Sequence, residues 1–127
     1  MPQIFMMLSP NAQKRLPEDP SEFFKEVATT VGILISQEWS VPTDDIACSV
    51  VNLVYTANEA DVQIELRYTV GEGLYHEGEM FDPPISMQAS LIESMIANIA
   101  PIFTRHQLLY SVWCKPFTNS RYEWPST

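Results

Sequence analysis

Met1-Pro2-Gln3-Ile4-Phe5-Met6-Met7-Leu8 begins the chain, and this stretch decides the fold. Residues 4–8 are five apolar residues in succession, too few for a helix and without the polar alternation of a half-exposed strand. Such a run is typical of a strand that is buried on both faces and therefore lies in the middle of a sheet. Pro2 enters this strand directly. If Met1 is removed, Pro2 presents a secondary amine at the mouth of the core.

The size and charge of the chain limit the classes of protein to which it can belong. Its 127 residues predict a single domain, 1–127, that buries roughly two-thirds of the surface of the unfolded chain. The formal net charge of −9 makes this an acidic protein and argues against nucleic acid or an anionic membrane as partner, because both require a basic face. A small anionic ligand is compatible with this charge, since a few local cations outweigh a distant net charge.

Neither a membrane anchor nor a metal site is expected. No run approaches the ~18 apolar residues of a membrane span, and the N-terminus lacks the layout of a signal peptide, so we expect a cytoplasmic protein. Cys48 and Cys114 fall in apolar, strand-like runs and predict two buried thiols rather than a disulfide or redox pair. His76 and His106 are far apart in the sequence and have no ligand spacing around them. We expect no metal and no cofactor.

Two helices follow from apolar spacing. Asp19, Pro20 and Glu22 supply a cap, a first-turn proline and a capping-box acid, and predict a helix that runs to about Glu38. A second helix is predicted over about 86–103, with Pro101 kinking or shortening its last turn. The predicted buried faces are Phe24, Val27, Ala28, Val31, Leu34 and Ile35 in the first helix, and Leu91, Ile92, Met95, Ile96 and Ile99 in the second.

Three further strands are predicted, over 46–55, 62–70 and 108–114. The second of these alternates apolar and polar residues strictly, which indicates one face on a core. A long loop, 71–84, joins the predicted strand 62–70 to the second predicted helix. It either closes over a site or forms a solvated connection pinned by Tyr75 and Phe81. The aromatic tail 115–127 is predicted to pack on the body or on a neighbouring subunit.

The order β-α-β-β-α-β predicts an α+β fold, a four-stranded sheet with two helices on one face. The other face of the sheet is then uncovered. Because the first strand is apolar on both sides, we expect other subunits to close that face in a homo-oligomer.

Met1-Pro2, the apolar strand after it and this element order resemble the tautomerase superfamily, which includes 4-oxalocrotonate tautomerase, macrophage migration inhibitory factor and 5-carboxymethyl-2-hydroxymuconate isomerase. The resemblance covers most of the chain. It implies a trimeric or hexameric assembly, here with a trimer favoured. It also implies that Pro2 is the general base of a cofactor-independent tautomerase or isomerase acting on small keto–enol substrates.

Elementary acid–base chemistry agrees with that role. A free α-amino group titrates at about 7.7–8.0, and burial disfavours its charged form. Such an amine is mostly neutral at cellular pH, so it is able to accept a proton. The proline ring also holds the lone pair in one direction.

The chain departs from the family at the cations that hold a substrate carboxylate. The family's arginine early in the second strand is replaced by the run Ile46-Ala47-Cys48, and its lysine after the first helix by Ser40-Val41. We assign Arg67, with Pro2, to catalysis; alternatively, Arg67 forms a cross-strand pair on an exposed face. The residues assigned to substrate binding are Lys14, Arg15, Tyr75 and Phe81, with solvent-facing loop cations as the alternative for the first two.

Two functions therefore stay open. One is the tautomerase or isomerase with Pro2 as base and a small-molecule ligand. The other is a non-catalytic ligand-binding or assembly protein on the same α+β scaffold, in which the acidic loop and the aromatic tail make the contacts. If Met1 is retained, Pro2 has no basic nitrogen and only the second function is left.

Overall fold

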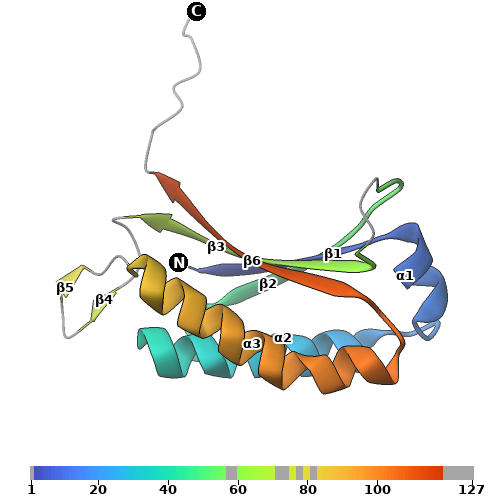
Figure 1. The fold of residues 1–127 in the computed structure, drawn as a ribbon, viewed down its shortest axis with the longest axis horizontal. Helices are drawn as coiled ribbons and strands as arrows, with labels where there is room; N and C mark the ends of the chain where they lie inside the picture. Colours follow the sequence, from blue (N-terminus) through green and yellow to red (C-terminus); the bar gives the residue numbers. More distant parts are fainter. Residues whose placement is uncertain (1, 57–59, 71–74, 77–78, 81–82, 119–127) are drawn as a thin grey trace, which may run out of the picture.

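Two long helices cover one face of a four-stranded sheet (Figure 1). The computed structural model describes residues 2–56, 60–70, 75–76, 79–80 and 83–118. The predicted α+β fold is confirmed. The strands are β1 (Gln3–Leu8), β2 (Ala47–Asn52), β3 (Val62–Val70) and β6 (Tyr110–Thr118), and the helices are α2 (Ser21–Trp39) and α3 (Ile85–Arg105).

The strand order is β2-β1-β3-β6. β1 runs parallel to β2 and antiparallel to β3, and β3 runs parallel to β6. Each parallel pair is joined through one long helix, as a crossover connection requires. The apolar N-terminal run is therefore a central strand, as predicted, and it pairs with β2 on one edge and with β3 on the other.

The core lies between the sheet and the helices. The side chains that β1 and β3 direct to this side, Ile4, Met6, Leu8, Val62, Ile64, Leu66 and Tyr68, are all buried. The opposite side of β1 is different, because Gln3 is exposed and Phe5 and Met7 are half-buried. One chain thus buries only one face of β1, and the predicted burial of both faces is not reached within a single chain.

The helices differ from their predicted outlines in two places. The buried stripe of α2 runs through Phe23, Val31, Ile35 and Trp39, one residue away from the predicted stripe at its start and one turn longer at its end. Of the two predicted effects of Pro101, a kink or a shortened last turn, the shortening is wrong, because α3 continues through Pro101 to Arg105. The last turn is held in place because Ile102 and Phe103 are buried in the core.

The connections also contain short elements that local patterns did not predict. They are α1 (Pro10–Arg15), η1 (Thr43–Asp45) and the two-residue strands β4 (Tyr75–His76) and β5 (Glu79–Met80), which pair with each other. α1 begins where Ser9 Oγ accepts a hydrogen bond from the Ala12 N–H at 3.0 Å. Among the helices of the described ranges, none has the length and apolarity needed to cross a bilayer.

The ends of two strands and the exposure of one cysteine also differ from the predictions. β2 ends at Asn52, and Val54 and Tyr55 beyond it are exposed, while β6 runs from Tyr110 to Thr118 rather than over 108–114. Both cysteines are free, but Cys48 is exposed because β2 is an edge strand. Most of the predicted tail, 119–127, lies outside the described residues.

Candidate functional site

Pro2 lies at the start of β1, at the end of the sheet where α2 ends (Figure 1). It is buried, and its carbonyl oxygen accepts a hydrogen bond from the Ala47 N–H at 3.3 Å. Continuing the two strand registers by one residue brings Pro2 between Ile46 of the β2 side and Tyr68 of β3. Because side chains alternate along a strand, the Pro2 ring is on the same side of the sheet as Ile4, the helix-covered side.

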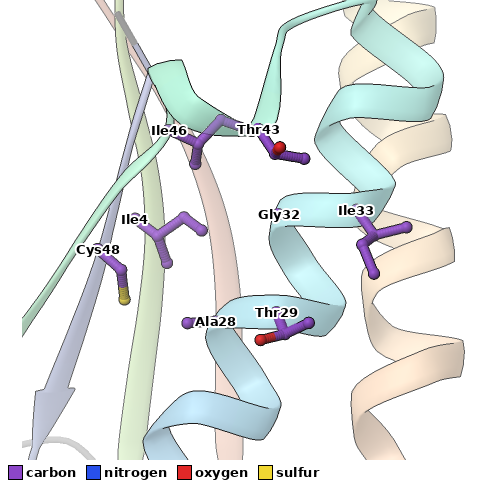
Figure 2. Close-up of a pocket in the computed structure, with 8 residues that line it drawn as sticks. All are labelled: Ile4, Ala28, Thr29, Gly32, Ile33, Thr43, Ile46 and Cys48. Carbon is purple, nitrogen blue, oxygen red and sulfur yellow. The ribbon is translucent and has the colours of Figure 1, made fainter.

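A cavity of about 400 Å³ opens on this side, between α2 and the β1–β2 pair (Figure 2). Pro2 is not one of its lining residues, but Ile4 and Ile46, which neighbour Pro2 along β1 and across to β2, both line it. At Gly32 an added Cβ would meet no atom within 4 Å, so the glycine keeps the cavity wide. The complete lining is Ile4, Ala28, Thr29, Gly32, Ile33, Thr43, Ile46 and Cys48.

This cavity has the character of a small-molecule site. Its volume falls within the range of about 300–1,000 Å³ that is usual for ligand pockets. Most of its lining is apolar, and the hydroxyls of Thr29 and Thr43 are the polar groups that can orient a bound molecule. Cys48 is exposed at the surface, but desolvation by the neighbouring side chains raises the pKa of its thiol, so this side chain stays neutral near pH 7.

Arg67 belongs to an ion-pair cluster on the other face of the sheet. Its Nη2 and Nε lie 2.6 and 2.7 Å from Glu65 Oε2. Glu65 Oε1 accepts from Lys115 Nζ at 2.7 Å and from Gln63 Nε2 at 2.9 Å. The Arg67 guanidinium also lies over the Phe5 ring, 4.2 Å from its centroid. These side chains cover Glu65, whose side chain is 3% exposed although no helix packs on this face.

The charges around Glu65 decide its ionisation. Burial by itself raises the pKa of a carboxyl group, but the hydrogen bonds and charges of Lys115 and Arg67 outweigh it and hold the Glu65 pKa below its ordinary value of 4.5. The carboxylate is therefore ionised at neutral pH, and both cations are engaged by it.

The structure does not bring Arg67 to the Pro2 ring within one chain. Arg67 pairs in register with Gln3, the residue after Pro2. Because alternate residues of β1 point to opposite faces, the Pro2 ring and the Arg67 guanidinium are separated by the sheet itself. In place of the cross-strand pair given as the alternative, the structure shows an ion pair on the helix-free face between Arg67 and Glu65 of the same strand, and Lys115 of β6 pairs with the same Glu65.

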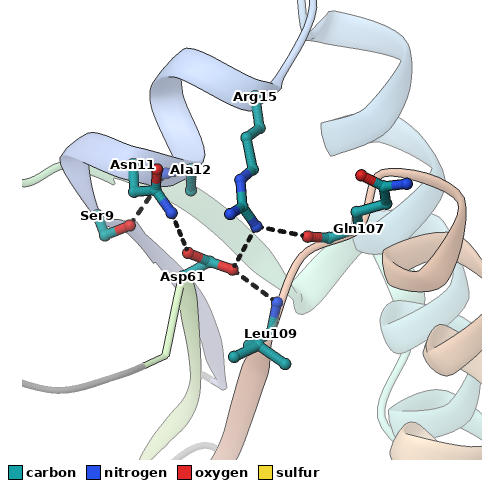
Figure 3. Close-up of polar contacts among 7 residues, drawn as sticks. All are labelled: Ser9, Asn11, Ala12, Arg15, Asp61, Gln107 and Leu109. Carbon is teal, nitrogen blue, oxygen red and sulfur yellow. Dashed lines mark hydrogen bonds and ion pairs between the residues drawn. The ribbon is translucent and has the colours of Figure 1, made fainter.

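Lys14 and Arg15 lie in α1, at the opposite end of β1 from Pro2 (Figure 1). The six residues of β1 span about 20 Å at about 3.3 Å each. Arg15 Nη1 donates to the Gln107 carbonyl oxygen at 2.8 Å and lies 3.5 Å from Asp61 Oδ2, while Lys14 is exposed (Figure 3). Within one chain, these cations are thus distant from Pro2.

The side chains of Tyr75 and Phe81, the two aromatic residues assigned to substrate binding, lie outside the described residues. The backbone of Tyr75 pairs with that of Met80 in the β4–β5 hairpin, but its side chain lies outside the described residues. Phe81 lies outside them altogether. Their role in substrate binding stays a prediction.

Trp39 is a residue of this region that sequence reasoning missed. The predicted helix ended at Glu38, yet Trp39 follows Ile35 by four residues and belongs to the same apolar stripe, a spacing that points to burial. Its ring meets Tyr68 edge to face, with centroids 5.1 Å apart and planes at 81°. It is 1% exposed, and its Nε1 is buried without a hydrogen-bond partner in the described part of the chain.

Comparison with known proteins places the fold. No protein-family model and no curated protein matches the sequence. A fused 4-OT, described as a wild-type symmetric trimer, matches with a TM-score of 0.60 and 9% identity over 97% of this chain and 91% of that chain. A macrophage migration inhibitory factor-like protein from Entamoeba histolytica matches with a TM-score of 0.58 and 15% identity, over 97% and 94% of the two chains.

A third solved structure, of Pt0534 inactivated by 2-oxo-3-pentynoate, matches with a TM-score of 0.60 and 10% identity over 97% of this chain and 91% of that one. At these identities the likeness concerns the fold. This chain therefore has the fold of tautomerase-superfamily structures, as its N-terminal stretch and element order predicted.

Proposed function

We propose that the chain is a cofactor-independent tautomerase or isomerase, in which Pro2 acts as general base on small keto–enol substrates after removal of Met1. The observation that supports this proposal is the position of Pro2. It is buried directly before the central strand β1, its carbonyl accepts a hydrogen bond from the Ala47 N–H, and it neighbours Ile4 and Ile46, which line an apolar cavity. The fold shared with tautomerase-superfamily structures agrees with it.

The proposed reaction requires the protein to hold the substrate next to the Pro2 nitrogen and to keep that nitrogen in apolar surroundings. The neutral Pro2 nitrogen takes a proton from the carbon beside a substrate carbonyl, and the electron pair of that C–H bond moves toward the carbonyl oxygen. The protonated amine then returns the proton to another atom of the same substrate. Apolar surroundings favour the neutral amine, which keeps the base ready at cellular pH.

Assembly as a cytoplasmic homotrimer is part of the proposal. The helix-free face of the sheet presents the half-buried Phe5 and Met7 and the exposed Trp113, and we expect neighbouring copies to cover it. Because Arg67 and Pro2 of one chain lie on opposite faces, the proposed role of Arg67 in catalysis requires the Pro2 of a neighbouring copy. The same holds for Lys14 and Arg15 as holders of a substrate anion.

A second candidate function is the non-catalytic ligand-binding or assembly protein. The observation that favours it is the engagement of Arg67 and Lys115 by Glu65, which gives both cations a structural use. In that case Pro2 serves only as the entry to β1.

The experiment that separates the two begins with the intact mass of the purified protein, which must lack Met1. The protein is then treated with 2-oxo-3-pentynoate, and the modified residue is identified by peptide mapping. We expect modification of the Pro2 nitrogen. We also expect the exchange of the C3 protons of 2-oxobutanoate in D₂O, followed by NMR, to fall by about 10²–10⁴-fold in Pro2→Ala.

Pro17→Ala, in an exposed loop, is the matched control and should keep the full exchange rate. A retained Met1, or an unmodified Pro2 in protein that lacks Met1, would overturn the proposal in favour of the binding or assembly protein.

A further inference from the structure

The side chain of Trp39 buries a polar group, its indole N–H, in a way that packing alone does not explain. Its Nε1 is the one buried side-chain nitrogen or oxygen in the described ranges that has no hydrogen-bond partner. Buried indole N–H groups usually find an acceptor. By contrast, Trp113, half exposed on the other face, donates its Nε1–H to Ser111 Oγ at 3.1 Å.

An unpaired buried donor destabilises the protein that contains it. Leaving one polar group desolvated and unpaired costs about 1–3 kcal/mol. A phenylalanine would serve the apolar stripe of α2 without this penalty. Because none of the described residues supplies an acceptor, the indole N–H at this position is free to donate to a bound ligand.

The position of Trp39 points to what that acceptor is. Its ring is in edge contact with Tyr68, 5.1 Å between centroids. Tyr68 faces Pro2 across the β1–β3 register, where opposed Cβ atoms are about 4.5–5.5 Å apart. All three residues are buried. α2 ends on the same side of the molecule as the N-terminus, where β1 begins (Figure 1). The Trp39 ring is thus linked to Pro2 through one intervening side chain, Tyr68.

We propose that Trp39 is a further catalytic residue, whose indole N–H donates a hydrogen bond to the carbonyl oxygen of a substrate bound at Pro2. The inference rests on the proposed function of Pro2. When the Pro2 nitrogen removes the proton, a C=C bond forms as the C=O π electrons move onto oxygen, and that oxygen becomes negative. A preorganised donor in apolar surroundings stabilises this charge more strongly than the ground-state carbonyl.

The same donor assists a reaction that does not depend on knowing the natural substrate. In the addition of the Pro2 amine to 2-oxo-3-pentynoate, an N–C bond forms at the distal alkyne carbon and one C≡C π pair moves through the conjugated system onto the carbonyl oxygen. The resulting enolate is then protonated at carbon. Donation from Trp39 to that oxygen accelerates the addition.

The first test compares the rate of Pro2 modification by 2-oxo-3-pentynoate in the wild type, Trp39→Phe and the control Tyr55→Phe, which removes an exposed hydroxyl beyond the far end of β2. We expect the rate in Trp39→Phe to fall by about 10²-fold, the usual effect of losing one such donor, and the rate in Tyr55→Phe to be unchanged. Equal rates in the wild type and Trp39→Phe overturn this inference alone. An unmodified Pro2 in the wild type is instead a failure of the proposed function.

The second test observes the donor directly. In ¹⁵N-labelled protein, the Trp39 indole N–H resonance is identified by its loss in Trp39→Phe, and the protein is titrated with 2,4-pentanedione in its enol form. We expect a downfield shift of the Trp39 resonance and no shift of that of Trp113. A Trp39 resonance that ignores the diketone, or that moves only with protein concentration because the N–H pairs with another copy, overturns the inference.

Discussion

The two ends of β1 each bury a polar group, but only one end satisfies it. At the Leu8 end, the carboxylate of Asp61 accepts from Asn11 Nδ2 at 3.1 Å and from the Leu109 N–H at 2.8 Å, with Arg15 3.5 Å away (Figure 3). At the Pro2 end, the Trp39 N–H has no partner in the described residues, and an apolar cavity lies nearby.

The difference separates structural from functional use of a buried polar group. A paired group contributes to stability because its desolvation is offset by hydrogen bonds, while an unpaired one is a liability that a ligand is able to remove. Asp61 joins α1, β3 and the turn before β6, which are far apart in sequence. Mutations at the two ends should therefore change the stability of the protein to different extents.

Asp61→Ala should break the paired end. It leaves the Leu109 N–H and the Asn11 amide without their acceptor in a site where Asp61 is 5% exposed. We expect a loss of about 3 kcal/mol in the free energy of unfolding, measured by urea denaturation. Asp19→Ala, at an exposed carboxylate that accepts hydrogen bonds from Ser21, is the control and should lose much less. Equal losses in the two variants would contradict a structural role for Asp61.

Glu65→Gln tests a second paired group. The variant leaves Arg67 and Lys115 without their counter-ion, but both are partly exposed to water, which reduces the effect. We expect a loss of about 1–2 kcal/mol in urea denaturation at pH 7. A variant as stable as the wild type would mean that water replaces the carboxylate fully.

The stability of the protein should also depend on pH through the ionisation of Glu65. Because the folded-state pKa of Glu65 is below its ordinary value of 4.5, the ionised carboxylate stabilises the fold above pH 4.5. This contribution is lost as the pH falls through the lower folded-state pKa. Urea midpoints measured from pH 7 to pH 3 should therefore fall less steeply in Glu65→Gln than in the wild type. Parallel curves would show that Glu65 is not the group responsible.

Gly32→Ala tests the cavity at the Pro2 end of β1. Its buried position in α2 leaves room for a Cβ, and alanine is the better helix former by about 0.5–1 kcal/mol. We expect a gain of that size in the free energy of unfolding, together with a raised KM for a substrate that fills the cavity. Ser36→Ala, on the same helix but outside the cavity lining, should leave KM unchanged.

Trp39→Phe should have the smallest effect on stability. The smaller ring loses packing contacts, but the variant also removes an unpaired N–H, and the two terms oppose each other. We expect a net change within about 1 kcal/mol in urea denaturation. A loss well above that of Glu65→Gln would indicate that the indole N–H is hydrogen-bonded in the folded protein.

Local patterns predicted the elements of the fold and the place of Pro2, but not the site around it. The departures follow one rule, that contacts distant in sequence override local preference. Pro101 does not end α3 because the residues after it are buried, and Arg67 lies away from the Pro2 ring because strand alternation sends them to opposite faces. The spacing from Ile35 points to the burial of Trp39, but its contact with Tyr68 could not be predicted because Tyr68 is on another element.

By itself, the sequence determined the α+β fold, the central place of β1, the strand Val62–Val70 and the place of Pro2 at the entry to β1, since each depends on the period of apolar residues or on the run that follows. Only the tertiary structure decided the partners of Asp61 and Glu65, the cavity between α2 and β2, and the unpaired N–H of Trp39 beside Tyr68. These features arise where separate elements meet. A period along the chain specifies which face of an element is buried, but not which side chains it meets there.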